Sequence, residues 1–201
     1  MSVRKVCVVI TARPSYSRVR SVLTAIKEHP DLELQLVVAA SALLERYGNA
    51  HLVMENEGFH IDRRIYMIVE GETLVTSAKS TGLGLAEIAT TLDDLKPDMV
   101  ITIADRFETI ATAIAATYTN IPLVHIQGGE VTGSIDEKVR HAITKLADIH
   151  LVASDKARDR VVRMGEREEK VFVTGCPSRI APVSMCSSSY PVGARPPARK
   201  P

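Results

Sequence analysis

Short apolar runs alternate with amphipathic segments from the start of the chain, and this alternation constrains the fold more than any other feature. Residues 5–10 read KVCVVI, a valine-rich run that is typical of a strand buried on both faces. Residues 16–28 carry apolar side chains three and four positions apart, as one face of a helix does. Strands and helices alternating in this way predict an α/β fold, with a parallel sheet covered by helices on both faces.

The alternation continues to residue 173. We expect further strands at 33–39, 61–65, 99–103, 122–126, 149–153 and 170–173, and further helices at 42–47, 52–57, 72–95, 106–119, 136–147 and 155–164. Parallel sheets bind their ligands at the carboxyl ends of the strands. Three polar segments follow strands in this pattern, so function is expected there: residues 11–17, 104–107 and 127–137.

The last part of the chain has a different composition. Hydrophobic residues make up 45% of the 201 residues, which is enough for one domain with a sizeable core. Five of the ten prolines, however, lie in residues 182–201, where no helical or strand period survives. We therefore expect a domain at 1–178 and a disordered or non-native tail at 179–201, produced by a truncation or a shifted reading frame.

Charge and cysteine content narrow the function classes. The net charge of +1 gives no basic surface for nucleic acid. Cys7, Cys176 and Cys186 are odd in number and far apart, so neither a disulfide framework nor a metal site is expected. The apolar run near the N-terminus is too short for a signal peptide or a membrane span. We expect a cytoplasmic protein that binds neither nucleic acid nor membranes.

The first candidate segment, TARPSYS, contains no glycine, so a dinucleotide site of the GxGxxG type is excluded. Arg13, with the hydroxyls of Ser15 and Ser17 at a helix start, instead suits an anion such as a diphosphate. The alternative is that Ser15 only caps the helix and Arg13 is a surface charge. The pattern alone leaves both interpretations open.

The second segment places Asp105 and Arg106 directly after the strand MVITI. Asp105 could act as a base, accept a hydrogen bond from a hydroxyl, or cap the next helix. A cation at a helix N-terminus is unfavourable unless an anion binds there too. Arg106 is therefore expected to contact a ligand.

The third segment, residues 125–137, has the densest set of polar groups in the chain. Its glycines would let the backbone approach a ligand closely. Ser134 and Glu137 fit a helix capping box, so Glu137 is assigned mainly to the cap. Glu130 and Asp136 stay open as functional carboxylates. His141, one helical turn further, is more often structural than functional in such a setting.

These segments resemble a known family. ADRFE at 104–108, HIQGGEVTGSIDEKVRHAITKLADIH at 125–150 and GCPS at 175–178 are similar, in order and spacing, to hydrolysing UDP-N-acetylglucosamine 2-epimerases of the sialic- and legionaminic-acid type. RPSYS at 13–17 matches the Arg-Ala-Asp-Tyr-Ser/Gly element of that family. The resemblance covers residues 4–178.

The resemblance implies a Rossmann-like domain that is the N-terminal half of a GT-B architecture, with a UDP-sugar in the cleft between two halves. It also implies loss of the C2 proton and anti elimination of UDP. Water then adds to the resulting 2-acetamidoglucal, which gives N-acetylmannosamine. The resemblance implies no cofactor and a homo-oligomer for the full-length form. Whether the sugar is GlcNAc or a 2,4-diacetamido relative stays open.

Residue roles follow from the resemblance where the motifs match. Asp105 and Asp136 would be catalytic acid/base groups. Gln127 stands where many relatives have Glu, so it would orient substrate rather than carry a proton, and Glu130 would supply the charge. The expected substrate contacts are Arg13, Pro14, Ser17, Arg106, Gly128 and His141. Ala104 for Gly, and Pro14-Ser15 for Ala-Asp, are departures that bear on fine specificity.

Two alternatives accompany this interpretation. One is a GT-B glycosyltransferase half, which would transfer the sugar to an acceptor. The other is a non-catalytic half-domain that only binds ligand or self-associates. The second GT-B domain is missing from these residues, and a cleft needs both walls to position substrate and exclude water. We therefore expect little or no epimerase activity from this polypeptide alone.

Overall fold

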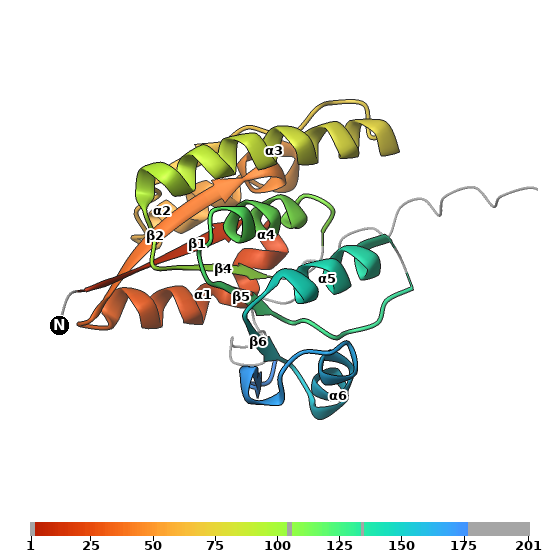
Figure 1. Ribbon diagram of the computed structural model, residues 1–201. Coiled ribbons are helices and arrows are strands. Elements are labelled where there is room, and N and C mark those ends of the chain that lie inside the picture. The colour runs from red at the N-terminus through yellow and green to blue at the C-terminus, as the bar shows by residue number, and fades with distance from the viewer. Residues whose placement is uncertain (1–2, 104–105, 134, 177–201) are drawn as a thin grey trace, which may run out of the picture.

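The computed structural model describes residues 3–103, 106–133 and 135–176. Seven parallel strands form one sheet in the order β3-β2-β1-β4-β5-β6-β7 (Figure 1). The strands are β1 (Arg4–Ile10), β2 (Leu32–Ala39), β3 (Arg63–Ile65), β4 (Met99–Ile103), β5 (Leu123–Ile126), β6 (Ile149–Val152) and β7 (Val171–Val173). The predicted parallel sheet is confirmed. The expected tail at 179–201 lies outside the described residues.

Helices cover both faces of this sheet, as predicted. They are α1 (Arg13–Glu28), α2 (Ala50–Asn56), α3 (Leu74–Leu95), α4 (Thr109–Tyr118), α5 (Ile135–Leu146) and α6 (Asp155–Arg163), with 3-10 turns η1 (Ala40–Leu43), η2 (Glu45–Tyr47) and η3 (Glu168–Lys170). One apolar cluster packs α1 and α2 against the sheet, and a second packs α3, α4 and α5 against its other face. Figure 1 shows α1 and α3 on opposite sides of β1 and β2.

The strand β1 shows why its sequence is continuously apolar. Val6, Val8 and Ile10 belong to the cluster under α1, whereas Cys7 and Val9 belong to the cluster on the opposite face. Successive side chains of a strand point to opposite faces, so both sets of side chains from Val6 to Ile10 are packed under helices and are apolar. Burial raises the pKa of the Cys7 thiol to about 12.

Several predicted helices differ from the structure in their bounds or type, and three of the differences have a local reason. The first helix begins at Arg13 instead of residue 16, because Pro14 suits its first turn. Ser15 is therefore a buried residue within the helix, and no side chain caps the N-terminus of α1. The helix predicted at 42–47 is the pair of 3-10 turns η1 and η2. The helix predicted from residue 106 begins at Thr109, so Arg106 lies in the turn before it.

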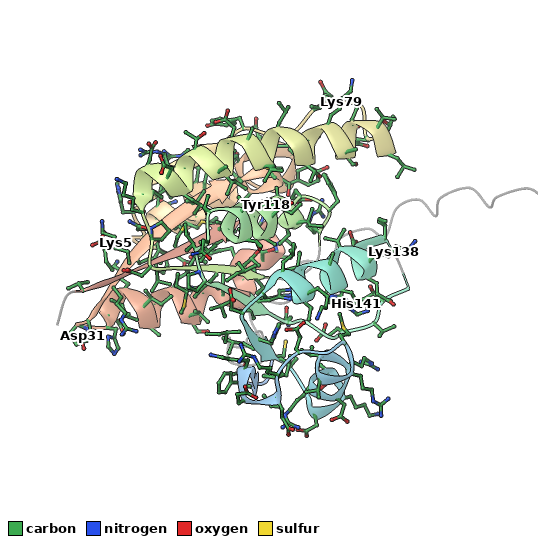
Figure 2. The ribbon with its side chains drawn as sticks, in the orientation of Figure 1. Lys5, Asp31, Lys79, Tyr118, Lys138 and His141 are labelled. Atoms are coloured by element: carbon green, nitrogen blue, oxygen red, sulfur yellow. The ribbon has the colours of Figure 1, made fainter. Side chains whose placement is uncertain are left out.

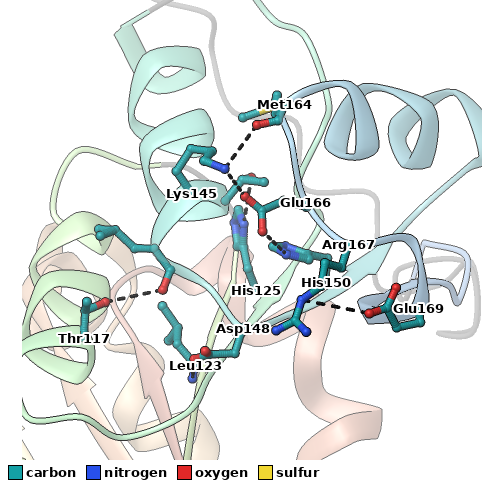
Figure 3. Close-up of polar contacts among 12 residues, drawn as sticks. Thr117, Leu123, His125, Lys145, Asp148, His150, Met164, Glu166, Arg167 and Glu169 are labelled. Carbon is teal, nitrogen blue, oxygen red and sulfur yellow. Dashed lines mark hydrogen bonds and ion pairs between the residues drawn. The ribbon is translucent and has the colours of Figure 1, made fainter.

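A polar cluster joins three elements at one border of the sheet (Figure 3). His150 of β6 is buried, and its Nε2 lies 3.3 Å from a carboxylate oxygen of Glu166 in the loop after α6. Lys145 of α5 also contacts the Glu166 carboxylate and donates to the carbonyl of Met164 at 3.1 Å. These contacts fix α5, β6 and the loop after α6 to one another.

Candidate functional site

The strand order changes direction between β1 and β4. From β1 the chain proceeds to β2 on one side, and from β4 it proceeds to β5 on the other. In open α/β sheets such a switch point leaves a crevice at the carboxyl ends of the strands, where ligands bind. Thr11 after β1 and Thr109 of α4 bridge the two sides, with 3.4 Å between their hydroxyl oxygens. All three sequence-predicted segments follow strands at this edge.

The edge lies far from the start of the strands. Figure 2 shows Lys138 and His141 of α5 at the opposite end of the molecule from Lys5 and Asp31, which mark the amino ends of β1 and β2. Asp105, expected to be catalytic, lies outside the described residues, as does Ser134.

A charged triad of Arg106, Glu108 and Asp136 occupies the edge after β4. The Nε of Arg106 donates to Oε1 of Glu108 at 2.8 Å, and the Glu108 side chain is 0% exposed. Burial raises the pKa of Glu108, while Arg106 acts in the opposite direction. Burial also raises the pKa of Asp136 in the first turn of α5, again opposed by Arg106. The charge of Arg106 therefore acts on the carboxyl group of Asp136, and both residues were predicted from the sequence.

The first turn of α1 carries Arg13, Pro14 and Ser17, all exposed. The guanidinium of Arg13 lies over Gly48, where a Cβ atom would collide with it. Gly48 has a φ of +82°, so glycine is favoured there on two grounds. Ser17 Oγ is 3.4 Å from the carbonyl oxygen of Arg13. An exposed guanidinium at a helix N-terminus is suited to an anion, as expected from the sequence.

Gln127 is buried at the end of β5 and connects two other elements. Its Oε1 accepts a hydrogen bond from Arg18 Nη1 at 3.1 Å, and its Nε2 donates to Cys176 Sγ at 3.2 Å. Its φ is +66°, an unfavourable value for a residue with a Cβ. Arg18 was not predicted from the sequence. It is one of several cationic residues on α1, and only the packing of α1 near the end of β5 distinguishes it.

The glycine-rich loop after β5 is packed closely against the protein itself. A Cβ at Gly128 would lie 3.0 Å from Nδ1 of His125, and a Cβ at Gly129 would collide with the carbonyl oxygen of Ala157 in α6. Arg160 Nη1 donates to the Gly129 carbonyl at 3.1 Å. These glycines are therefore required for internal packing, and the expected contact of Gly128 with substrate stays a prediction.

Carboxylates of this loop divide into two kinds. Glu137 accepts hydrogen bonds from the backbone N–H groups of Thr132 and Gly133, at 2.8 and 2.6 Å. These bonds hold the pKa of Glu137 below its usual value, which agrees with the capping role assigned to it. For Glu130, the backbone carbonyl accepts from Arg140, whereas its carboxylate makes no hydrogen bond or ion pair within residues 3–103, 106–133 and 135–176.

His141 faces Glu137 one turn along α5, with 3.8 Å between Nε2 and Oε1. Its Nδ1 is buried and has no hydrogen-bond partner in the described part of the chain. Within the described residues, the imidazole of His141 thus has Glu137 beside Nε2 and a buried Nδ1 without a hydrogen bond.

A pocket opens beside Arg106, between η1, η2, the loop after β3 and the start of α3. No sequence pattern predicts this pocket, because its walls come from four separate segments. Its lining consists of Ser41, Leu44, Arg46, Tyr47, Ile68, Val69, Glu72, Thr76, Ser77, Ser80, Arg106 and Phe107.

Among the described residues, no three His, Cys, Asp or Glu side chains are grouped so as to hold a metal ion. In the same residues, no helix has the length and apolar character needed to cross a membrane.

Comparison with known proteins identifies the family. Residues 24–181 match the family model described as UDP-N-acetylglucosamine 2-epimerase. The chain belongs to this family. Among curated epimerases it is 37% identical over 175 residues to the UDP-N,N'-diacetylbacillosamine 2-epimerase (hydrolyzing) of Legionella pneumophila. It is 34% identical over 176 residues to the GDP/UDP-N,N'-diacetylbacillosamine 2-epimerase (hydrolyzing) of Campylobacter jejuni.

Both alignments cover 87% of this chain and 46% of the relative, so the chain spans about half the length of these epimerases. The solved UDP-GlcNAc 2-epimerase from Neisseria meningitidis, bound to UDP-GlcNAc, superposes with a TM-score of 0.76 at 22% identity, over 87% of this chain and 47% of that one. Such epimerases have the GT-B fold, of which this Rossmann-like domain is about half. The fold prediction is confirmed.

Proposed function

We propose that the carboxyl edge of this sheet binds a UDP-sugar and takes part in the hydrolysing 2-epimerisation of that sugar. The observation that carries the proposal is the position of Arg106, which contacts the buried Glu108 and acts electrostatically on Asp136 at the switch point of the sheet. The same edge thereby offers a cation for a diphosphate and a carboxylate whose pKa burial raises. The relatives that act on UDP-sugars support the same assignment.

In this proposal the phosphates bind between two cationic positions. Arg13 and Ser17 at the first turn of α1 contact one side of the diphosphate, and Arg106 contacts the other. The partial positive charge of the α1 N-terminus adds to the attraction. Pro14, Gly128 and His141 complete the contacts with the sugar nucleotide.

The proposed chemistry needs groups that exchange protons near neutral pH. One carboxylate removes the proton from C2 of the sugar, and the C1–O bond to UDP breaks on the opposite face, which leaves a C1–C2 double bond. Water then adds its oxygen to C1, and a proton returns to C2 from the other side, which gives N-acetylmannosamine from UDP-GlcNAc. We assign the two proton-transfer roles to Asp136 and Asp105. A raised pKa in Asp136 suits it to hold and release a proton.

Gln127 has no proton to exchange, so it orients the substrate while Arg18 holds its amide in place. The carboxylate of Glu130 would supply the charge that Gln127 lacks. For the sugar itself we carry two substrates forward, UDP-GlcNAc and a UDP-2,4-diacetamido sugar, because the two relatives above are named for N,N'-diacetylbacillosamine, a sugar with two acetamido groups. We also propose that the functional epimerase is a homo-oligomer.

The test uses the isotope-labelled polypeptide of residues 1–201 and NMR. Titration with UDP at millimolar concentrations should shift the amides of Thr11, Gln127 and Gly129 and leave those of Lys5 and Asp31 unchanged. Uniform or absent shifts would contradict the proposed site.

An activity assay in D₂O separates the chemistry from the binding. Release of UDP together with deuterium at C2 of the free sugar is the signature of the proposed reaction. Because relatives are about twice as long, we expect slow or undetectable turnover by residues 1–201 alone. Transfer of the sugar to an acceptor, with no deuterium at C2, would instead indicate a glycosyltransferase.

A further inference from the structure

Glu108 has a fully buried carboxylate that does not cap α4, the helix that follows it. It occupies the N-cap position of α4, yet no side-chain cap hydrogen bond is formed there. Its backbone φ and ψ are −73° and −20°, which are helical rather than extended. The side chain therefore has a different function from the usual capping carboxylate.

The only ion pair of Glu108 within the described residues is with Arg106, whose side chain is 45% exposed. The other carboxylate oxygen, Oε2, is buried and has no hydrogen-bond partner in that part of the chain. Removing a carboxylate from water is unfavourable, and one half-exposed partner offsets only part of the loss. Stability of the fold is therefore a poor explanation for this pair.

The geometry of the pair suggests a different explanation. Glu108 accepts from Nε of Arg106, the nitrogen on the inner side of the guanidinium. This bond fixes the plane of the group and leaves the two terminal amino groups, Nη1 and Nη2, for another acceptor. Arg106 also lines the pocket at the carboxyl edge. A guanidinium held in this way presents a two-pronged donor, which matches the oxygens of a phosphate.

We infer that Glu108 is a positioning residue, which holds Arg106 so that both terminal amino groups face the diphosphate of the bound nucleotide. The inference rests on the proposed binding of a UDP-sugar at this edge. It gives Glu108 a role that the resemblance did not assign to it, and it assigns to Glu108 no contact with substrate.

The experiment compares UDP with uridine, which lacks the diphosphate, by NMR titration of the 201-residue chain. Glu108→Gln keeps the shape of the side chain and removes its charge. We expect it to weaken UDP binding by about five- to tenfold, the difference between a charged and a neutral hydrogen bond to Arg106. Uridine binding should not change. The Arg106 Nε–H resonance, identified by its loss in Arg106→Gln, should move in Glu108→Gln.

A double-mutant cycle tests whether Glu108 acts through Arg106. In the Arg106→Gln background, adding Glu108→Gln should have no further effect on UDP affinity. The matched control is Glu55→Gln, which removes the charge from another carboxylate paired with an arginine, Arg64 of β3, three strands from β4 in the sheet order. It should leave both affinities unchanged. Glu108→Asp, which keeps the charge but shortens the side chain, should also weaken UDP binding, and it replaces Glu108→Gln if that variant does not fold.

Two results would overturn the inference while leaving the proposed function intact. One is wild-type UDP affinity in the Glu108 variants. The other is a loss of UDP affinity that is equal when Glu108→Gln is added to the wild type and to Arg106→Gln, or a loss that is equal for UDP and uridine. Either result would mean that Glu108 acts on the fold in general. If the wild-type chain binds neither UDP nor uridine, the proposed function is wrong as well.

Discussion

Arg18 Nη1 donates a hydrogen bond to Oε1 of Gln127 over 3.1 Å, and so connects two residues that are 109 positions apart. The contact joins α1, which follows β1, to the end of β5 across the switch point of the sheet. It also holds a side chain whose backbone has a φ of +66°. The amide of Gln127 is thus fixed at the carboxyl end of β5.

Replacing Gln127 by Glu tests what Arg18 does to that position. Arg18 lies within hydrogen-bond distance and should lower the pKa of the new carboxylate, whereas the burial of this position raises it. A lowered pKa in the folded state stabilises the protein above the pKa of the unfolded chain, and the stabilisation is lost as the pH falls through the folded pKa. Carboxyl NMR and urea denaturation at pH 7 and pH 3.5 would measure both effects. Adding Arg18→Gln should raise the pKa again, and an unchanged pKa would contradict this account.

Gly129→Ala should destabilise the domain more than Gly133→Ala. Both glycines have a positive φ, of +77° and +71°. A Cβ at Gly129 would also collide with the Ala157 carbonyl, whereas a Cβ at Gly133 meets nothing within 4 Å. We expect a loss of about 1 kcal/mol at Gly133 from backbone strain, and about 3 kcal/mol at Gly129 from strain plus overpacking. Equal losses in urea denaturation would show that the close approach to α6 is unimportant.

Arg106→Gln should raise the pKa of Asp136. Burial already raises this pKa, and the positive charge of Arg106 opposes the effect. Without that charge, the protonated form of Asp136 gains population at a given pH. Carboxyl NMR of the variant and the wild type would show the shift. The pKa of Glu137, whose lowering comes mainly from the backbone of Thr132 and Gly133, should stay low in both and serves as the internal control.

His150 should make the fold sensitive to mild acid. Burial lowers its pKa, and the nearby Glu166 only partly offsets this effect. The unfolded chain takes up a proton near pH 6.5 and the folded chain does so only at lower pH. The stability present above pH 6.5 is therefore lost as the pH falls towards the folded pKa. The urea concentration at the midpoint of unfolding should decrease when the pH is lowered from 7.5 to 5.5. The decrease should be smaller in His150→Gln. His60→Gln, at a side chain that is 88% exposed, should behave as wild type.

The strands could be predicted because burial on both faces of the sheet favours a continuous run of apolar residues. The run MVITI became β4 with the predicted bounds. The start of α4 could not be predicted, because the chain makes a further turn that places Glu108 beneath Arg106. Arg18 was missed for a related reason. Its partner is 109 residues away, and no local pattern distinguishes a helix cation that faces a strand end from one that faces water.

Pairing of β1 with β4 has a consequence for how the chain folds. The N–H of Lys5 binds the side chain of Asp98, 93 residues further along, and Val6 to Val8 pair with Met99 to Ile101. During synthesis at about 5–20 residues per second, β1 therefore waits on the order of 5–20 s for its central neighbour. Parallel pairing over such separations is slow. The crevice at the switch point consequently cannot form before β4 has been made, and a nascent chain stalled before β4 would leave one long side of β1 open to a chaperone or to another chain.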